Sequence, residues 1–170
     1  MNATKQINAR LTKEDWAGAR ELIRAELRKD PHDHWLLTQL STTYYEEKKY
    51  RRALTIVKKA LAEMPTCPLV LWDYAGTLDM LGQRRKAMAI YKKLLRTDVP
   101  ETAYDECWEG KEWAAALRAD CKYRIAQCYR DLGNKRQFSR YWNDYVADVH
   151  RGVDSIYKDK VLLVAEGRAS

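Results

Sequence analysis

Histidines and cysteines are the side chains of this sequence that could bind a metal ion or attack a substrate. The chain has 170 residues with three histidines and four cysteines. His32 and His34 follow Pro31 in a polar stretch, and Cys67 lies much further along the chain. Metal sites use donors at short, paired spacings, which these residues lack. We therefore expect solvated loop histidines and no metal site.

The remaining cysteines favour packing over nucleophilic catalysis. Cys121 and Cys128 are seven residues apart, which places them on one face of a helix, and we expect both to be buried. Cys107 lies among acidic residues, which disfavour the reactive thiolate. The sequence also lacks a phosphate-binding loop, a dinucleotide-binding loop and a serine-hydrolase motif. It therefore predicts no catalytic residue, no cofactor and no enzyme activity.

A period of 34 residues organises the elements that carry these side chains. Pro31 and Pro65 are one period apart. Three columns of apolar residues repeat at the same step: Ala19, Ala53 and Ala87; Ile23, Val57 and Tyr91; Leu27, Leu61 and Leu95. A unit of this length cannot bury its apolar face alone, so the pattern predicts a stack of similar units.

The period and the residue types resemble the tetratricopeptide repeat. The second unit carries the family's residues Leu40, Tyr44, Tyr50, Ala53, Ala60, Leu61 and Pro65. The third carries Tyr74, Ala75, Leu78, Gly82, Ala87, Tyr91 and Leu95. The segment from Tyr104 to Gly133 is also similar to a stretch of uncharacterised bacterial proteins with these repeats. The resemblance implies an all-α fold, a short right-handed superhelix (α-solenoid) of helix-turn-helix repeats in a single domain, 1–170.

The expected organisation follows from this resemblance and from helical periodicity. The repeat-like units are about 12–33, 34–67, 68–101 and 119–152, with an acidic insertion at 102–118. Thr12 is expected to cap a helix over 13–29, with Asp15 reaching back as in a capping box. Further helices are expected at about 34–47, 50–63, 69–81, 84–97, 111–132 and 135–149. An apolar stripe on the long helix contains Trp113, Leu117, Cys121, Ile125, Cys128 and Leu132. A helix at about 155–165 is expected to cap the stack.

The resemblance also implies a concave groove lined by the first helix of each unit. Positions two, five, nine and twelve of the units face this groove in the family. The predicted partner-binding residues are Trp35, Thr38, Thr42, Tyr45, Trp72, Asp79, Tyr123 and Arg130. Packing against the next helix is the alternative role for these side chains. Thr42, Gly76 and Gln127 stand where a chaperone-binding clamp needs asparagine, so that clamp is disfavoured.

The second helices are basic in a chain whose formal net charge is +7. Arg51, Arg52, Arg85 and Lys86 stand where the family usually has acidic residues. We expect a basic ridge there, either as a solvated face or as a docking surface for an acidic protein or a nucleic acid.

These features predict a non-enzymatic protein–protein interaction module that binds a partner protein or peptide in the groove. One alternative is an immunity or antitoxin protein that neutralises a bacterial toxin by direct binding. A second is a repeat protein that binds RNA through the basic ridge. Nucleic acid is the less favoured partner, because few aromatic residues interleave with the charges. No apolar segment is long enough for a signal or a membrane span, so we expect a cytoplasmic location with reduced cysteines.

Overall fold

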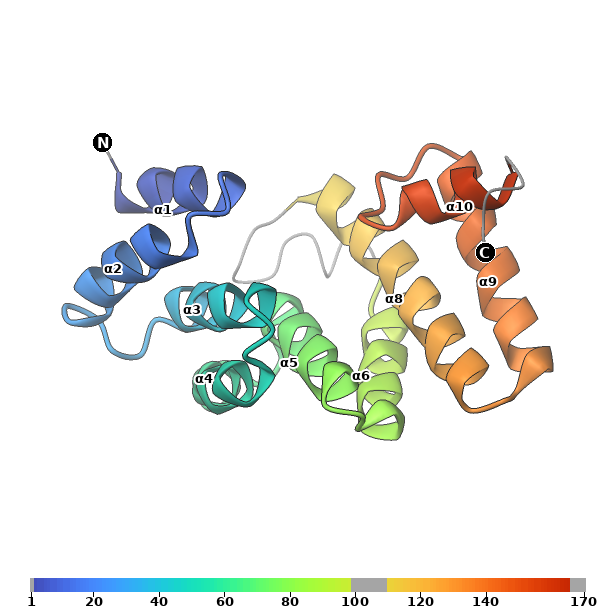
Figure 1. Cartoon of the computed structure of the whole chain (residues 1–170), viewed down its shortest axis with the longest axis horizontal. Coiled ribbons are helices and arrows are strands. Elements are labelled where there is room, and N and C mark those ends of the chain that lie inside the picture. The colour runs from blue at the N-terminus through green and yellow to red at the C-terminus, as the bar shows by residue number, and fades with distance from the viewer. Residues whose placement is uncertain (1, 99–109, 166–170) are drawn as a thin grey trace. The chain divides into compact units, whose positions relative to one another are not determined.

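A computed structural model describes residues 2–98 and 110–165, with side chains as far as Val161. In these two ranges all regular structure is helical, which confirms the all-α prediction (Figure 1). The helices are α1 (Ala3–Thr12), α2 (Trp16–Leu27), α3 (His34–Glu46), α4 (Tyr50–Glu63), α5 (Pro68–Met80), α6 (Arg84–Arg96), α8 (Lys111–Asp131), α9 (Lys135–His150) and α10 (Lys158–Ala165). The helices from α3 to α9 begin and end within two residues of the predicted bounds.

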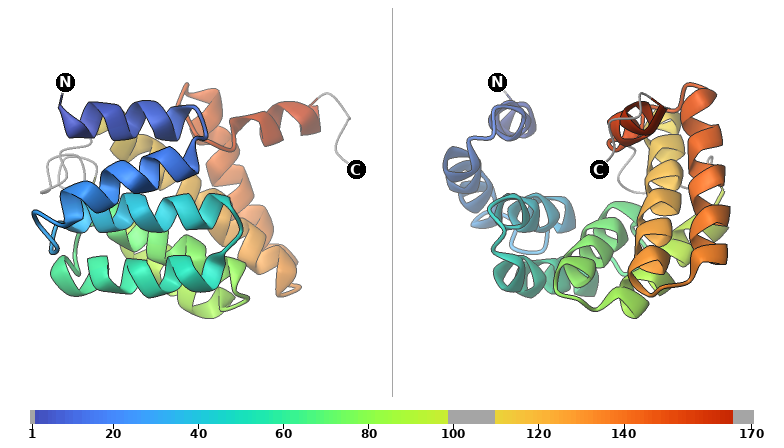
Figure 2. Two further views of the ribbon diagram at one scale, coloured as in Figure 1. Left: turned by 60° about the vertical axis from the view of Figure 1, so that its left-hand side comes forward. Right: turned by 45° about the vertical axis from the view of Figure 1, so that its right-hand side comes forward.

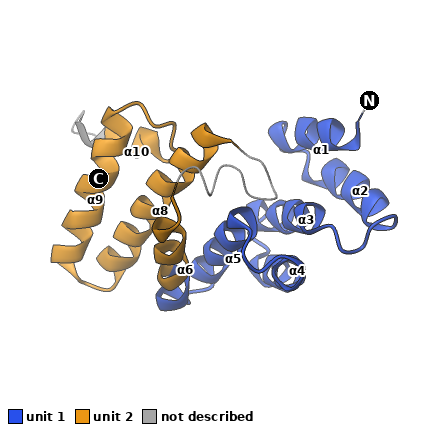
Figure 3. Cartoon of the chain, turned by 180° about the vertical axis from the view of Figure 1, so that it is seen from behind, with its two compact units in different colours: residues 1–87 blue, residues 88–170 orange. Residues whose placement is uncertain are grey.

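Contacts between backbone segments divide the chain into two compact units. Unit 1 comprises residues 1–87 and unit 2 comprises residues 88–170 (Figure 3). The boundary falls inside α6, so the first turn of this helix belongs to unit 1 and the remainder to unit 2. The single domain and the boundaries of the four repeat-like units stay predictions.

Unit 1 is a series of helices in which each packs against the next. Helix α2 packs between α1 and α3, and α3 also contacts α4 and α5 (Figure 1). Ala19 and Ala53 are fully buried where the 34-residue period places small side chains. Small side chains let neighbouring helices approach closely, and larger apolar residues such as Ile23 and Val57 fill the space beside them.

The N-terminal helices begin and end differently from the prediction. Thr12 does not cap the helix predicted at 13–29. It ends α1, and its hydroxyl donates to the Asn8 carbonyl at 2.9 Å. Asp15 is the N-cap of α2, and its Oδ1 accepts from the Gly18 backbone N–H at 2.9 Å. The polar segment before Thr12 folds as a helix because Ile7 is fully buried in the unit 1 core.

Unit 2 is built on α8 and α9, which lie side by side (Figure 2). Gly133, with a φ of 72°, lies in the turn between them, in a conformation that favours glycine. Cys121 and Cys128 are buried on α8, as predicted. Leu132 does not belong to the buried stripe, because it lies at the C-cap, past the last helical residue, where 44% of it is exposed.

Helix α10 begins three residues later than the capping helix predicted at 155–165. Ser155 lies before this helix, is 2% exposed and takes part in a buried hydrogen-bond network in unit 2. None of the helices in the described residues is both long enough and apolar enough to span a bilayer.

Candidate partner-binding surfaces

Helices α3 and α5 are the first helices of the two middle units, and they pack directly against each other. Each starts with a residue suited to a helix N-terminus. Asp33 caps α3, with its Oδ1 accepting from the Leu36 backbone N–H at 2.9 Å. Pro68 occupies the first turn of α5, where its missing N–H costs no hydrogen bond. The predicted groove residues of unit 1 lie on these two helices.

The four predicted groove residues of α3 differ in exposure. Trp35 and Tyr45 are partly buried and pack against the apolar core of unit 1. Thr38 is 1% exposed, and its hydroxyl donates to the His34 carbonyl at 2.7 Å. Thr42 is partly buried, with its hydroxyl 3.1 Å from the Thr38 carbonyl. Trp35 and Tyr45 are therefore the two large side chains among these four residues, and both stay partly exposed.

Asp73 on α5 is a residue that the sequence analysis missed. Its Oδ1 lies 3.4 Å from Thr42 Oγ1 on α3, and its Oδ2 is buried with no hydrogen-bond partner. Desolvation by burial raises the pKa of this carboxyl to about 7. The pairing shows that position nine of one unit meets position six of the next. The repeat alone did not indicate this, because Thr42 and Asp73 are 31 residues apart.

Trp72 and Asp79 are the predicted groove residues of α5, and both are partly buried. Trp72 directly precedes Asp73. Trp35 and Trp72 therefore lie on two adjacent, contacting helices of unit 1. Whether their rings face one concavity stays a prediction.

The other two predicted groove residues, Tyr123 and Arg130, lie on α8 in unit 2. The Tyr123 ring stacks on the Tyr157 ring, with 4.2 Å between centroids and 17° between planes. Arg130 is exposed and lies 3.5 Å from the carboxylate of Asp131. Tyr123 thus packs against other aromatic side chains. Packing was the alternative to partner binding that the sequence analysis gave for the predicted groove residues.

The basic residues of the predicted ridge are all exposed. Arg51 and Arg52 lie in the first turn of α4, and Arg85 and Lys86 lie in the first turn of α6. The side chain of Lys86 donates to Gln83 at 3.1 Å. That the four residues form one continuous ridge stays a prediction. Lys48 and Lys49, which the sequence analysis overlooked, extend the basic run on the α4 side, and Tyr50, named there only as a repeat residue, lies between them and Arg51.

The candidate metal and nucleophile residues are scattered. His32 Nδ1 lies 2.8 Å from the Glu63 carboxylate, and this hydrogen bond raises the pKa of His32. Cys67, Cys121 and Cys128 are buried free thiols. Cys107 and the part of the insertion from 102 to 109 lie outside the described residues. Across the described ranges, no three His, Cys, Asp or Glu side chains come together as a metal site.

Comparison with known proteins agrees with this helical arrangement. Residues 44–106 match the family profile described as Tetratricopeptide repeat. This part of the chain therefore carries tetratricopeptide repeat sequence. The matched segment runs from the end of α3 through α6, which includes the third repeat-like unit. No curated protein matches the sequence at a significant level.

Several solved structures share the fold at low sequence identity. MamA MSR-1 matches with a TM-score of 0.58 and 19% identity, over 84% of this chain and 72% of that chain. MamA from Desulfovibrio magneticus RS-1 matches with a TM-score of 0.52 and 16% identity, over 90% of this chain and 96% of that chain. A tetratricopeptide repeat protein from Parabacteroides merdae matches with a TM-score of 0.50 and 20% identity, over 98% of this chain and 73% of that chain. These matches confirm the predicted fold, a solenoid of tetratricopeptide repeats.

Proposed function

We propose that this tetratricopeptide repeat protein is a non-enzymatic interaction module that binds a segment of a partner protein across α3 and α5. The observation that carries the proposal is the direct packing of these helices, with partly buried Trp35, Tyr45 and Trp72 on them. Partly buried aromatic side chains offer a large contact area at a low cost in conformational entropy, and they dominate many protein interfaces. The partner segment would bury an apolar side chain against the two indoles.

The polar groups on the same two helices would set the orientation of the segment. Thr42 and Asp79 are partly buried on α3 and α5, so neither is fully withdrawn from solvent. Thr38 contributes little to binding in this proposal, because it is buried and its hydroxyl is bonded within α3. Buried free cysteines support a reducing, cytoplasmic setting for the interaction.

The test begins with affinity capture of the partner from the native cell and its identification by mass spectrometry. Binding of the purified partner is then measured by calorimetry for Trp35→Ala and Trp72→Ala. Each change is expected to weaken binding about thirtyfold or more, because loss of a central aromatic contact typically costs 2 kcal/mol or more. Trp16→Ala is the matched control, since Trp16 is a partly buried tryptophan on α2, a second helix.

Circular dichroism must show unchanged helicity for all three variants. Wild-type affinity in both groove variants would contradict the proposal. The same capture also separates the alternatives. A toxin whose activity is blocked by binding would make the chain an immunity protein, and recovery of RNA would favour the basic ridge.

A further inference from the structure

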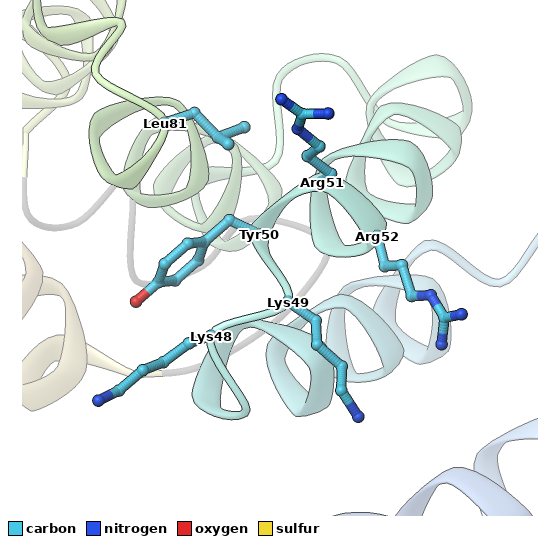
Figure 4. A pocket seen from close by; sticks show the side chains of 6 residues that line it. All are labelled: Lys48, Lys49, Tyr50, Arg51, Arg52 and Leu81. Carbon is cyan, nitrogen blue, oxygen red and sulfur yellow. The ribbon is translucent and has the colours of Figure 1, made fainter.

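A basic pocket lies at the turn between α3 and α4, and its lining includes none of the predicted groove residues. It has a volume of about 520 Å³ and opens widely to solvent. The residues that line it are Lys48, Lys49, Tyr50, Arg51, Arg52 and Leu81 (Figure 4). All six belong to unit 1. Four of the six are basic and none is acidic.

Within the described residues, three of the four cationic side chains of the basic pocket have no carboxylate partner. Lys49 pairs with Glu47 at 2.8 Å, and Glu47 also pairs with Arg20 on α2. Lys48, Arg51 and Arg52 are exposed, and no carboxylate in the described part of the chain pairs with them. The first turn of α4 also lacks an acidic residue and a side-chain cap, so the positive end of the helix dipole adds to the same field.

The cationic side chains of the basic pocket do not converge on one point. Figure 4 shows Arg51 and Arg52 pointing away from each other and away from Lys48 and Lys49. Arg52 is partly held in place, because its guanidinium lies 5.9 Å from the centre of the Tyr44 ring. One phosphate or carboxylate cannot contact all these groups. An extended segment with several spaced carboxylates can.

The basic pocket also has an apolar part. The Tyr50 side chain and Leu81 lie beside each other at one edge, and both are partly buried (Figure 4). The Tyr50 ring makes an edge-to-face contact with the Tyr45 ring, with 5.3 Å between centroids. A partner side chain placed against Tyr50 and Leu81 would therefore bury apolar area at a pre-formed surface.

We propose that the basic pocket docks an acidic segment of a partner protein. Carboxylates of the segment pair with Lys48, Arg51 and Arg52, and one aromatic or aliphatic side chain packs against Tyr50 and Leu81. Single-stranded nucleic acid fits less well, because it is bound by several stacked aromatic side chains and this lining has one. The docking surface touches the proposed groove through the contact between Tyr50 and Tyr45, but its cationic residues lie outside the groove, so the two proposals can be tested with different variants.

The experiment measures fluorescence anisotropy of a labelled peptide in which glutamates flank a central tyrosine. The test variant carries Lys48→Gln, Arg51→Gln and Arg52→Gln. The control variant carries Arg28→Gln, Lys58→Gln and Lys59→Gln, which removes the same charge from exposed positions of unit 1 outside the pocket. Both sets are at the surface, so both variants are expected to keep the wild-type melting temperature.

We expect the test variant to bind the peptide roughly tenfold more weakly, since each exposed ion pair contributes modestly, and the control to bind within about twofold of wild type. A peptide with serine in place of the tyrosine is expected to bind several-fold more weakly to the wild type. Equal losses in both variants, or equal binding of the two peptides, would overturn the proposal. So would tighter binding of a polyuridine oligonucleotide than of the peptide, because the pocket would then be a nucleic-acid surface.

Discussion

Ser155 Oγ donates a hydrogen bond to Asp120 Oδ1 at 2.5 Å, which ties the segment before α10 to the middle of α8. The Tyr145 hydroxyl on α9 lies 2.9 Å from the same Ser155 oxygen, and all three residues are buried. Burial raises the pKa of Asp120 to about 6, while the hydrogen bond from Ser155 opposes that rise. One serine hydroxyl thus joins three elements of unit 2.

Replacing Ser155 with alanine is expected to lower the unfolding free energy by about 1–3 kcal/mol, because it removes a hydrogen-bond donor from a buried carboxyl. Urea denaturation followed by circular dichroism measures the change. Ser139→Ala, an exposed serine on α9, is the control and is expected to stay within about 0.5 kcal/mol of wild type. Equal midpoints for the two variants would show that the network does not stabilise unit 2.

Asp73 is expected to make stability fall as the pH rises toward neutrality. Its pKa is about 7 in the folded protein and 3.8 as the reference value for the unfolded chain. Between these values the folded state holds a proton that the unfolded state has lost. Its contribution is therefore fully present below pH 4 and is lost as the pH rises through 7, a change on the order of 4 kcal/mol.

The variant Asp73→Asn keeps the shape of the side chain and removes the titration. We expect it to melt above the wild type at pH 8, where the wild type must bury a charge, and close to it at pH 5. Thermal melts between pH 5 and pH 8 measure the difference in melting temperature between the two proteins. The other titrating groups affect both proteins equally, so their effect drops out of this difference. Asp144→Asn, at an exposed position on α9, is the control and should follow the wild type. A constant difference at every pH would place the Asp73 pKa outside this window.

The sequence predicted the helical stack well because a repeat states the same constraint several times. Ala19, Ala53 and Ala87 share one column, and all three are fully buried. If one residue of such a column departed from the pattern, the other two would still predict where the helices pack. The turn at Gly82, with a φ of 77°, was likewise predictable from glycine's tolerance of that conformation.

Features that depend on one contact between distant residues were not predictable. Asp73 lies within hydrogen-bond distance of Thr42 on another helix, and no local sequence pattern indicates that these two residues are close in space. Thr12 and Asp15 both suit a helix N-cap, and the sequence alone does not show that Asp15 caps α2 while Thr12 ends α1. For the basic pocket a signal existed, since four basic residues surround Tyr50 in the sequence, but the repeat directed attention to Arg51 and Arg52 alone.

Ala53 tests the close approach of helices directly. It is fully buried on α4, and the Ser41 hydroxyl on α3 donates to its carbonyl at 3.2 Å. Ala53→Leu is expected to cost about 1–3 kcal/mol by overpacking and to lower the melting temperature by roughly 2–4 °C per kcal/mol. Ala62→Leu makes the same change at an exposed position of α4 and should melt as the wild type does. An unchanged melting temperature in Ala53→Leu would mean that α3 and α4 are not closely packed there.

Buried thiols offer a last test, because each cysteine reports the opening of its own unit. Cys67 in unit 1 and Cys128 in unit 2 are 3% and 1% exposed, and burial raises the pKa of Cys121 well above its usual value. In a Cys107→Ser background, an aromatic disulfide reagent should react with the three thiols on the order of a thousandfold more slowly than with an exposed thiol. Ser139→Cys supplies that exposed thiol in the same chain. Adding urea to the Cys107→Ser protein should make all three thiols react at the rate of an exposed thiol. Stoichiometric reaction on mixing in native buffer would show that these helices do not enclose them.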